Sequence, residues 1–255
     1  MSLTEYINKR KKDKSILIMA HQVLGYPDFE TNYEMIKLFA KYNIDLIELQ
    51  IPFSEPLADG PLFLKANQEA LMSSTTVKEC VNFAKKVYED FGIPLIFMTY
   101  YNVMYSIGIE RFVKLSKESG VKGFIIPDAL PEQSEDYVCL SKKYKIDPIF
   151  LATSYTPKHR LRYLSETTGG FLYCVARKGV TGYKTNFDVN TAEFLNNCKK
   201  ISEKPLGLGF GIQNKKDIDF LIGKSDIAII GSQLLKLLND SGLEGVEEFL
   251  ASITE

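Results

Sequence analysis

Short apolar runs alternate with longer amphipathic stretches along the whole chain. Each run is six to eight residues long and is bounded by Gly, Pro or Asp. This pattern is typical of strands that are buried on both faces of a parallel sheet. It predicts eight strands, at residues 15–20, 44–51, 94–99, 122–127, 147–152, 170–175, 204–209 and 226–231.

The stretches between these runs carry their apolar residues on one face, as helices packed on a sheet do. Helices are predicted at residues 29–42, 76–91, 109–119, 132–144, 158–167, 189–201, 214–222 and 243–253. An added N-terminal helix is expected at residues 2–13, where it would close the bottom of a barrel. Extra short helices are expected after strands two and eight, at residues 62–73 and 233–236.

Eight strands that each precede a helix predict a parallel sheet with right-handed crossovers. We therefore predict an α/β fold, a closed (β/α)8 TIM barrel, and the alternative is a doubly wound open sheet. One such barrel takes about 250 residues. No Gly/Ser-rich, Pro-rich or low-complexity linker divides the 255 residues, so residues 1–255 are expected to form one domain.

Composition narrows the classes of function. The chain has 31 Lys and Arg against 32 Asp and Glu, a net charge of −1, which argues against a nucleic-acid binder held by a basic field. No run approaches the roughly 18 apolar residues that span a membrane, and no targeting segment is convincing. The chain has four cysteines, without a CxxC pair, and two histidines, so it offers few ligands for a metal site. We expect no metal, free thiols and a cytoplasmic protein.

Two carboxylates stand out near the end of the second strand, because barrels of this kind keep their active site at the carboxyl ends of the strands. Alternation puts Leu46, Glu48 and Gln50 on the inward face. A poorly solvated Glu48 binds a proton more tightly and suits general acid–base catalysis, and a Glu–Lys pair in a polar layer is the alternative. Asp59 follows in a loop that three prolines stiffen, either as a second carboxylate on this face or within an Asx turn.

Glycine-rich segments follow three consecutive strands. Gly182 comes after the sixth strand, Gly211 after the seventh, and Gly231 with Ser232 after the eighth, where Ser232 is expected to cap a short helix. Bare backbone N–H groups and a helix N-terminus bind anions such as phosphate. The alternative is that each glycine serves only a tight turn.

Three further side chains near strand ends are less specific. Tyr173 is expected to share an inward face with Phe171, and a plain core aromatic is the better interpretation of it without other information. Tyr100 follows the third strand and carries no signal by itself. His21 follows the first strand, and nothing in the sequence pairs with it.

Several of these segments together resemble one family. The segment ELQIPFSEPLADGP at residues 48–61 resembles the signature of the tryptophan synthase alpha subunit. The same holds for GYP at 25–27, YN at 101–102, IPD at 126–128, GVTG at 179–182, GFGI at 209–212 and GS at 231–232. The resemblance covers nearly the whole chain, in order.

The resemblance implies a cytoplasmic lyase that cleaves indole-3-glycerol phosphate to indole and glyceraldehyde 3-phosphate, without a cofactor of its own. Its partner would be the pyridoxal-phosphate beta subunit, in an αββα complex. By position, Glu48 and Asp59 match the catalytic carboxylates and Tyr173 an active-site tyrosine. The remaining matches are the phosphate site, at Gly182, Gly211, Gly231 and Ser232, and the substrate pocket and closing loop, at Tyr100, Phe210, Thr181 and Arg177.

The chemistry of this cleavage fits the two carboxylates. A retro-aldol reaction here needs C3 of the indole protonated and the side-chain hydroxyl deprotonated, and Glu48 in a poorly solvated site could shuttle those protons. Protonation at C3 puts positive charge on the ring nitrogen, which an ionised Asp59 would stabilise. A bound phosphate would fix the far end of the substrate, so that the reacting atoms stay aligned.

The chain also departs from the family pattern. Gln50 stands where the family usually has Gly, beside the catalytic Glu, and His21-Gln22 is atypical. Phe63-Leu64 replaces the common Ile-Gln, and Glu55 and Val23 replace the usual Asp and Thr. The alternatives are therefore a phosphate-binding barrel that mainly activates a partner, and a stand-alone lyase with an altered substrate. The chain keeps both Glu48 and Asp59, which favours the interpretation that it is a catalyst.

Overall fold

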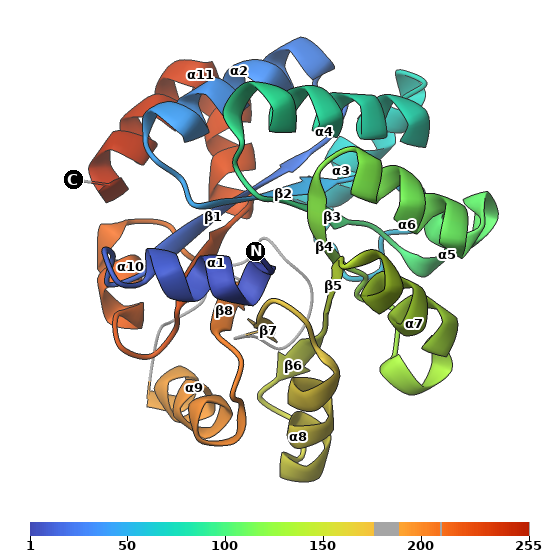
Figure 1. The fold of residues 1–255 in the computed structure, drawn as a ribbon. Coiled ribbons are helices and arrows are strands. Elements are labelled where there is room, and N and C mark those ends of the chain that lie inside the picture. Colours follow the sequence, from blue (N-terminus) through green and yellow to red (C-terminus); the bar gives the residue numbers. More distant parts are fainter. Residues whose placement is uncertain (176–188, 210, 255) are drawn as a thin grey trace.

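The computed structural model describes residues 1–175, 189–209 and 211–254. Within them, nine parallel strands follow one another around a ring, with the helices outside (Figure 1). The strands are β1 (Leu17–Val23), β2 (Leu46–Gln50), β3 (Leu95–Met98), β4 (Val121–Ile125), β5 (Asp147–Ile149), β6 (Leu151–Thr153), β7 (Leu172–Val175), β8 (Leu206–Gly209) and β9 (Ile227–Ile230).

The order of the strands confirms the predicted barrel. Spatial order runs β5-β4-β3-β2-β1-β9-β8-β7-β6, so neighbours in the ring are neighbours in the chain apart from the β1–β9 closure. A doubly wound sheet would instead reverse direction at a switch point. The two edge strands, β5 and β6, are separated in the chain only by Phe150, so the chain itself joins the two edges. The predicted strand at 147–152 is thus divided into two short ones.

The helices match the predicted alternation closely. They are α1 (Leu3–Arg10), α2 (Phe29–Lys41), α3 (Pro61–Met72), α4 (Val77–Phe91), α5 (Tyr101–Ile107), α6 (Ile109–Glu118), the 3-10 turn η1 (Pro131–Gln133), α7 (Glu135–Tyr144), α8 (Lys158–Thr167), α9 (Val189–Ile201), α10 (Lys215–Leu221) and α11 (Ser232–Thr254). The extra helix after the second strand is α3. The one after the last strand is the first part of α11, which kinks at Gly242, where φ is 63°. The pattern missed α5.

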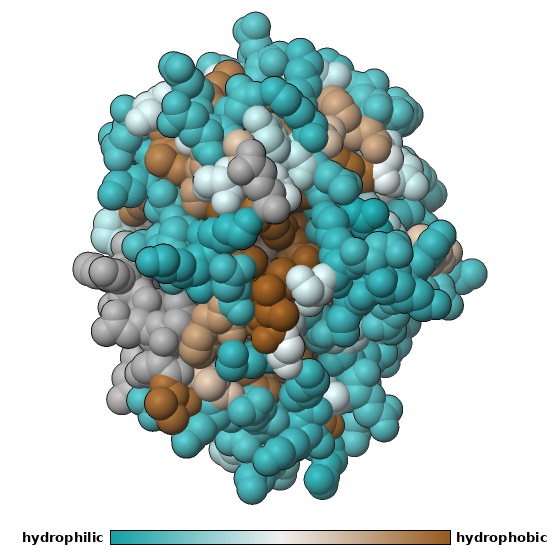
Figure 2. Space-filling view, turned by 90° about the vertical axis from the view of Figure 1, so that its left-hand side faces the viewer, coloured by the Kyte–Doolittle hydropathy of each residue, from teal (hydrophilic) through white to brown (hydrophobic). Residues whose placement is uncertain are grey.

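Alternation along each strand separates two apolar layers. Inward side chains such as Leu46 and Phe171 fill the barrel interior, whereas their outward neighbours such as Ile47 and Leu49 pack under the helices. The helices turn their polar faces to water, and the side of the molecule in Figure 2 is accordingly mostly hydrophilic, with hydrophobic residues in a central hollow and in smaller patches elsewhere. No helix in the described ranges is long and apolar enough to cross a membrane.

The N-terminal helix closes the amino end of the barrel, as predicted. Leu3 and Ile7 of α1 belong to the apolar cluster of the barrel interior, and α1 lies across that end of the ring (Figure 1). Buried Asp45 holds the helix there, because its carboxylate accepts hydrogen bonds from Arg10 Nη2 at 2.6 Å and from Lys14 Nζ at 3.0 Å. The same carboxylate accepts the Ile18 N–H at 3.0 Å.

Replacing Asp45 by Ala should therefore destabilise the whole barrel. The change leaves a buried backbone N–H unpaired and two cations without their counter-charge, which costs about 2–4 kcal/mol of unfolding free energy. Urea unfolding followed by circular dichroism measures this loss. The control is Glu34→Ala, which breaks an exposed pair with Lys37 on α2 and should cost about 0.5 kcal/mol or less. Equal losses in the two variants would contradict the role of Asp45.

Candidate functional site

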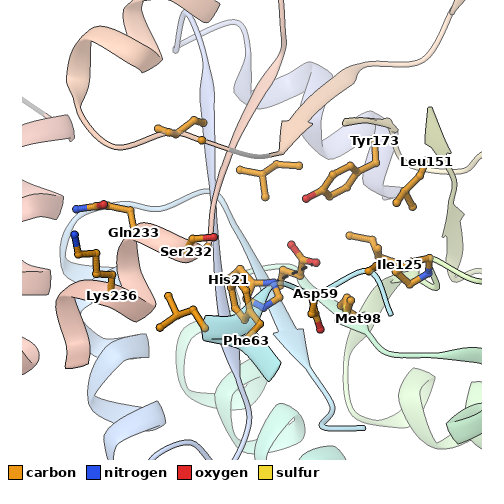
Figure 3. A pocket seen from close by; sticks show the side chains of 18 of the residues that line it. His21, Asp59, Phe63, Met98, Ile125, Leu151, Tyr173, Ser232, Gln233 and Lys236 are labelled. Atoms are coloured by element: carbon orange, nitrogen blue, oxygen red, sulfur yellow. Dashed lines mark ion pairs between the residues drawn. The ribbon is translucent and has the colours of Figure 1, made fainter. Parts of the chain in front are cut away.

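A cavity opens at the carboxyl ends of the strands, the end of the barrel opposite α1. Its lining residues come from at least six strands or from the loops that follow them, and several of their side chains are drawn in Figure 3. Tyr173 and Leu151 lie on one side of the cavity and Ser232, Gln233 and Lys236 on the other, with His21 and Asp59 between them (Figure 3). The site is therefore shared by segments that are far apart in the chain, as in other barrels of this class.

Glu48 lies inside the barrel, as the alternation predicted. Its side chain is almost fully buried and lines the cavity. Parallel pairing places His21 of β1 directly beside it, and His21 Nδ1 lies 3.3 Å from Glu48 Oε1. Within the described part of the chain, the other oxygen, Oε2, has no hydrogen-bond partner. One oxygen is thus held by the protein, and the other is available to a molecule in the cavity.

Asp59 sits beside Glu48 at the cavity wall, on the loop after β2. Its Oδ2 accepts a hydrogen bond from Gln50 Nε2 at 2.6 Å, and the Tyr100 hydroxyl is a second partner. Burial raises the pKa of the Asp59 carboxyl above its ordinary value, although the Gln50 amide, the nearby His21 and the Tyr100 hydroxyl all favour the ionised form. The prediction that both carboxylates share one face matches this placement.

His21 and Gln50 connect Glu48 to Asp59 through polar contacts, and the sequence interpretation missed this connection. The statement that nothing pairs with His21 is wrong, because Glu48 lies at its Nδ1 and Gln50 Oε1 lies 3.0 Å from its Nε2. The predicted first strand ended at Ala20, yet β1 continues to Val23. Extending the alternation of Met19 by two residues would have put His21 on the inward face beside Glu48.

Tyr173 lies on β7 and shares the barrel interior with Phe171, as expected. Burial raises the pKa of its hydroxyl well above the ordinary value, and the negative charges of Glu48 and Asp59 add to this rise. The tyrosine therefore stays protonated and can donate a hydrogen bond in the cavity. Gly209 makes room for it, since a Cβ there would come within 2.1 Å of the Tyr173 hydroxyl oxygen.

The glycines in and after the last two strands divide into two groups. Gly207 and Gly209 serve packing, because a Cβ on either would collide with Phe171 or Tyr173. Gly211 and Gly231, in contrast, line the cavity. Sequence could not separate Gly211 from the two packing glycines, since all three occur in one Gly-X-Gly-X-Gly run.

Gly231 and Ser232 open α11 at the cavity. The expectation that Ser232 caps this helix is wrong, because the Leu235 N–H bonds to the Gly231 carbonyl at 3.1 Å and Ser232 is already the first helical residue. Gly231 occupies the cap position, and the first turn of α11 lines the cavity, where its backbone N–H groups suit an anion. Gln233 and Lys236 join them at the cavity wall, and the spacing of four residues from Ser232 to Lys236 was the signal for a shared face.

Tyr100 does not line the cavity. Its buried ring stacks on Phe53, with the ring centroids 5.3 Å apart, and its hydroxyl accepts the Ala58 N–H at 3.1 Å. Tyr100 therefore supports the loop that carries Asp59. Four other predicted site residues lie outside the described residues, namely Arg177, Thr181, Gly182 and Phe210.

Known proteins resemble this chain over nearly its full length. The family model of the tryptophan synthase alpha chain matches residues 7–254. A tryptophan synthase alpha chain of Desulfotalea psychrophila is 46% identical over 253 residues, which are 99% of this chain and 100% of the relative. Among solved structures, a chain of Mycobacterium tuberculosis tryptophan synthase has a TM-score of 0.92 at 24% identity, covering 99% of this chain and 96% of that one, and shows the fold alone. A tryptophan synthase complex from Pyrococcus furiosus has a TM-score of 0.85 at 26% identity, covering 94% and 96%.

Replacing Tyr100 by Phe should move the titration of Asp59 to higher pH. The Tyr100 hydroxyl favours the ionised form of the Asp59 carboxyl. Without this hydroxyl, less interaction offsets the effect of burial, and the pKa of Asp59 rises further. Carbon-13 NMR of the side-chain carboxyl groups follows this titration directly. The control is Tyr105→Phe, which removes an exposed hydroxyl from α5. An Asp59 titration that is identical in the two variants would contradict the proposed support.

Proposed function

The chain belongs to the tryptophan synthase alpha chain family, whose members cleave indole-3-glycerol phosphate to indole and glyceraldehyde 3-phosphate, and from this premise we propose that Glu48 and Asp59 carry the cleavage. The protein is thus a carbon–carbon lyase of tryptophan biosynthesis. The observation that supports the assignment is the free oxygen of Glu48. It is a buried carboxylate oxygen without a partner in the described part of the chain, on a side chain that lines the cavity.

Glu48 is the proton shuttle in this proposal. Protonated at Oε2, it delivers a proton to C3 of the indole, and the resulting carboxylate takes the proton of the hydroxyl on the carbon attached to C3. The bond between these carbons breaks, and the hydroxyl carbon leaves as the aldehyde of glyceraldehyde 3-phosphate. Glu48 ends protonated, as it began, so no other acid or base is consumed. Glu48 is almost fully buried at the cavity wall, and poor solvation of its carboxylate makes such a transfer effective at near-neutral pH.

Asp59 acts on the charge that develops in the ring. Protonation of C3 leaves a positive charge on the ring nitrogen, and an ionised Asp59 placed in advance stabilises that charge without reorganisation. The hydrogen bonds from Gln50 and Tyr100 keep the carboxylate ionised and in place. Tyr173 forms the opposite wall of the same cavity, and it orients the indole.

The phosphate end of the substrate lies at the start of α11. Gly211, Gly231 and Ser232 provide backbone N–H groups there, and the helix N-terminus favours an anion. Lys236 lines the same part of the cavity and adds a full positive charge. This anchor leaves the indole between Glu48 and Tyr173, with the reacting carbons aligned.

The partner is the tryptophan synthase beta subunit, which in this proposal supplies pyridoxal phosphate, while the alpha chain holds no cofactor. Large hydrophobic side chains are exposed on the segments that follow four of the strands, and thus on the end of the barrel where the cavity opens. They are Leu57, Tyr105, Leu130 and Tyr155, with exposed fractions of 82%, 67%, 43% and 59%. Exposed apolar side chains favour binding to another protein, and a beta subunit seated on this end of the barrel would receive indole directly.

Two further points belong to the proposal. The described residues form one ring of strands with continuous apolar layers, which supports a single domain over residues 1–255. The described cysteines, Cys80, Cys139, Cys174 and Cys198, are all free thiols. Free thiols are stable in a reducing compartment, which supports a cytoplasmic location.

Glu48→Gln should lower kcat for indole release by at least about 100-fold, because general acid–base catalysis of this kind contributes roughly 10²–10⁴. Asp59→Asn should cost about as much through lost charge stabilisation, and KM should change little in either. Purified protein is assayed with and without the beta subunit. Glu55→Gln is the control, since it removes an exposed carboxylate from the same loop.

The same assay separates the alternatives. A chain that mainly activates its partner would still raise the beta reaction after Glu48→Gln, and its own cleavage would be weak from the start. A stand-alone lyase would show no increase on addition of the beta subunit. Undiminished cleavage in Glu48→Gln would refute the catalytic assignment.

Lys236→Met should raise KM for indole-3-glycerol phosphate about tenfold and leave kcat within about twofold. A charge-assisted hydrogen bond to phosphate is worth about 1.5 kcal/mol or more, and it acts equally on substrate and transition state. Steady-state kinetics separates the two constants. Lys78→Met, on an exposed position of α4, is the control, and a fall in kcat with an unchanged KM would count against the phosphate role.

A further inference from the structure

His21, which lies between Glu48 and Gln50, has no part in the cleavage as described so far. His21 is a buried titratable group that touches the catalytic Glu on one ring nitrogen and Gln50 on the other. Gln50 in turn donates to Asp59. A continuous chain of polar contacts therefore joins the two carboxylates that perform the reaction.

Backbone groups fix the direction of the hydrogen bonds in this chain. Asn67 Nδ2 donates to the Phe63 carbonyl at 2.8 Å, so Asn67 Oδ1 is the atom that accepts the Phe53 N–H at 3.0 Å. Gln50 Nε2 donates to that same oxygen at 3.5 Å and to Asp59 at 2.6 Å. The amide of Gln50 is thereby oriented, and its oxygen is left for His21.

This orientation determines the protons on His21. Gln50 Oε1 can only accept, so the proton between the two residues belongs to His21 Nε2. The other nitrogen, Nδ1, faces Glu48 Oε1 at 3.3 Å. Two bare lone pairs would repel each other there, so one proton lies between them. The pair is either an imidazolium with a carboxylate or a neutral imidazole with a carboxylic acid.

The surroundings isolate this shared proton. Phe63 of α3 meets the imidazole edge-on, with ring centroids 4.8 Å apart, and Gly231, directly after β9, lies close to the His21 side chain. The titratable groups near His21 are Glu48 and Asp59, and Tyr173 on β7 senses the same two carboxylates. Lys236 lines the same cavity from α11. Water is excluded from most of the ring, which is almost fully buried.

We propose that His21 is a positioning residue that stores the catalytic proton for Glu48, and that Gln50 keeps its imidazole in the tautomer this requires. The proposal rests on the catalytic role of Glu48 given above. In the resting site the proton lies on His21 Nδ1. When substrate displaces water, the proton moves from His21 Nδ1 to Glu48 Oε1. Rotation of the carboxyl group then turns the protonated oxygen toward the substrate, where Glu48 delivers the proton to C3 and recovers one from the substrate hydroxyl. Apart from the proton on His21 Nε2, the pair holds one shared proton before and after each turnover.

The electrostatics agree with this geometry. Burial by itself lowers the pKa of His21, but the Glu48 carboxylate, Asp59 and the Gln50 oxygen outweigh burial and raise the pKa above the ordinary value. The pair therefore keeps its single proton over a wider pH range than a glutamate could alone. A lone Glu ordinarily loses its proton about two pH units below a lone His.

The first experiment is the pH profile of His21→Phe, which keeps an aromatic ring against Phe63 and removes both nitrogens. We expect kcat near pH 8 to fall at least about tenfold while KM stays within about twofold. The alkaline limb of the kcat profile should move to lower pH by about one unit or more, because Glu48 must then hold the proton unaided. His159→Phe is the matched control, since it removes the other histidine of the chain from an exposed position on α8 and should leave the profile unchanged.

A second measurement does not depend on turnover or on how His21→Phe folds. In the His159→Phe background His21 is the only imidazole, so nitrogen-15 NMR reports its protonation and tautomer. We expect protonation at Nε2 at every pH, and loss of the Nδ1 proton above the ordinary histidine range. In Glu48→Gln the counter-charge is gone and burial dominates, so that loss should shift to lower pH.

Each outcome decides the proposal. A neutral His21 protonated on Nδ1 alone, or a titration that Glu48→Gln leaves in place, overturns the shared proton. An unchanged pH profile in His21→Phe, alongside inactive Glu48→Gln, overturns the storage role and leaves Glu48 as the catalyst. Activity that survives in Glu48→Gln overturns the assignment of Glu48 and this inference with it.

Discussion

A carboxylate inside an apolar barrel is the constraint on which the site depends. Leu46, Ile96 and Ile229 fill the barrel interior beneath Glu48, and an isolated charge in such surroundings costs several kcal/mol. The parallel register of β1 and β2 lowers this cost, since it places His21 beside Glu48. Because only one oxygen of the carboxylate is held in this way, the site is stable without substrate and still has a reactive atom to offer.

The second carboxylate is held by a different method. Asp59 comes from a loop, so its position depends on what the loop packs against. Asn67 fixes the beginning of the loop through the Phe53 N–H, Tyr100 fixes the Ala58 N–H, and Gln50 reaches Asp59 itself. A loop tied at three points presents its carboxylate with little ordering cost on each turnover, which catalysis by prior placement requires.

Much of the fold was predictable because it rests on local pattern. Apolar runs of one strand length, alternating with amphipathic helices, gave the eight βα units, the helix at the N-terminus and α3. Inward alternation at Leu46, Glu48 and Gln50 was equally local. The misses have local causes too. Polar His21 and Gln22 hid the end of β1, Phe150 gave no sign of the break between β5 and β6, and α5 was too short to show a period.

The sequence by itself determined the order of the elements, the inward face of β2 and both carboxylates, because each depends on residues only a few positions apart. Tertiary structure decided which side chains meet. Three contacts join separate strands or loops. His21 pairs with Glu48, Gln50 donates a hydrogen bond to Asp59, and Tyr173 packs so closely on Gly209 that no side chain fits there. Such contacts follow from the strand register and the closure of the ring, and the spacing of residues along the chain predicts neither of them.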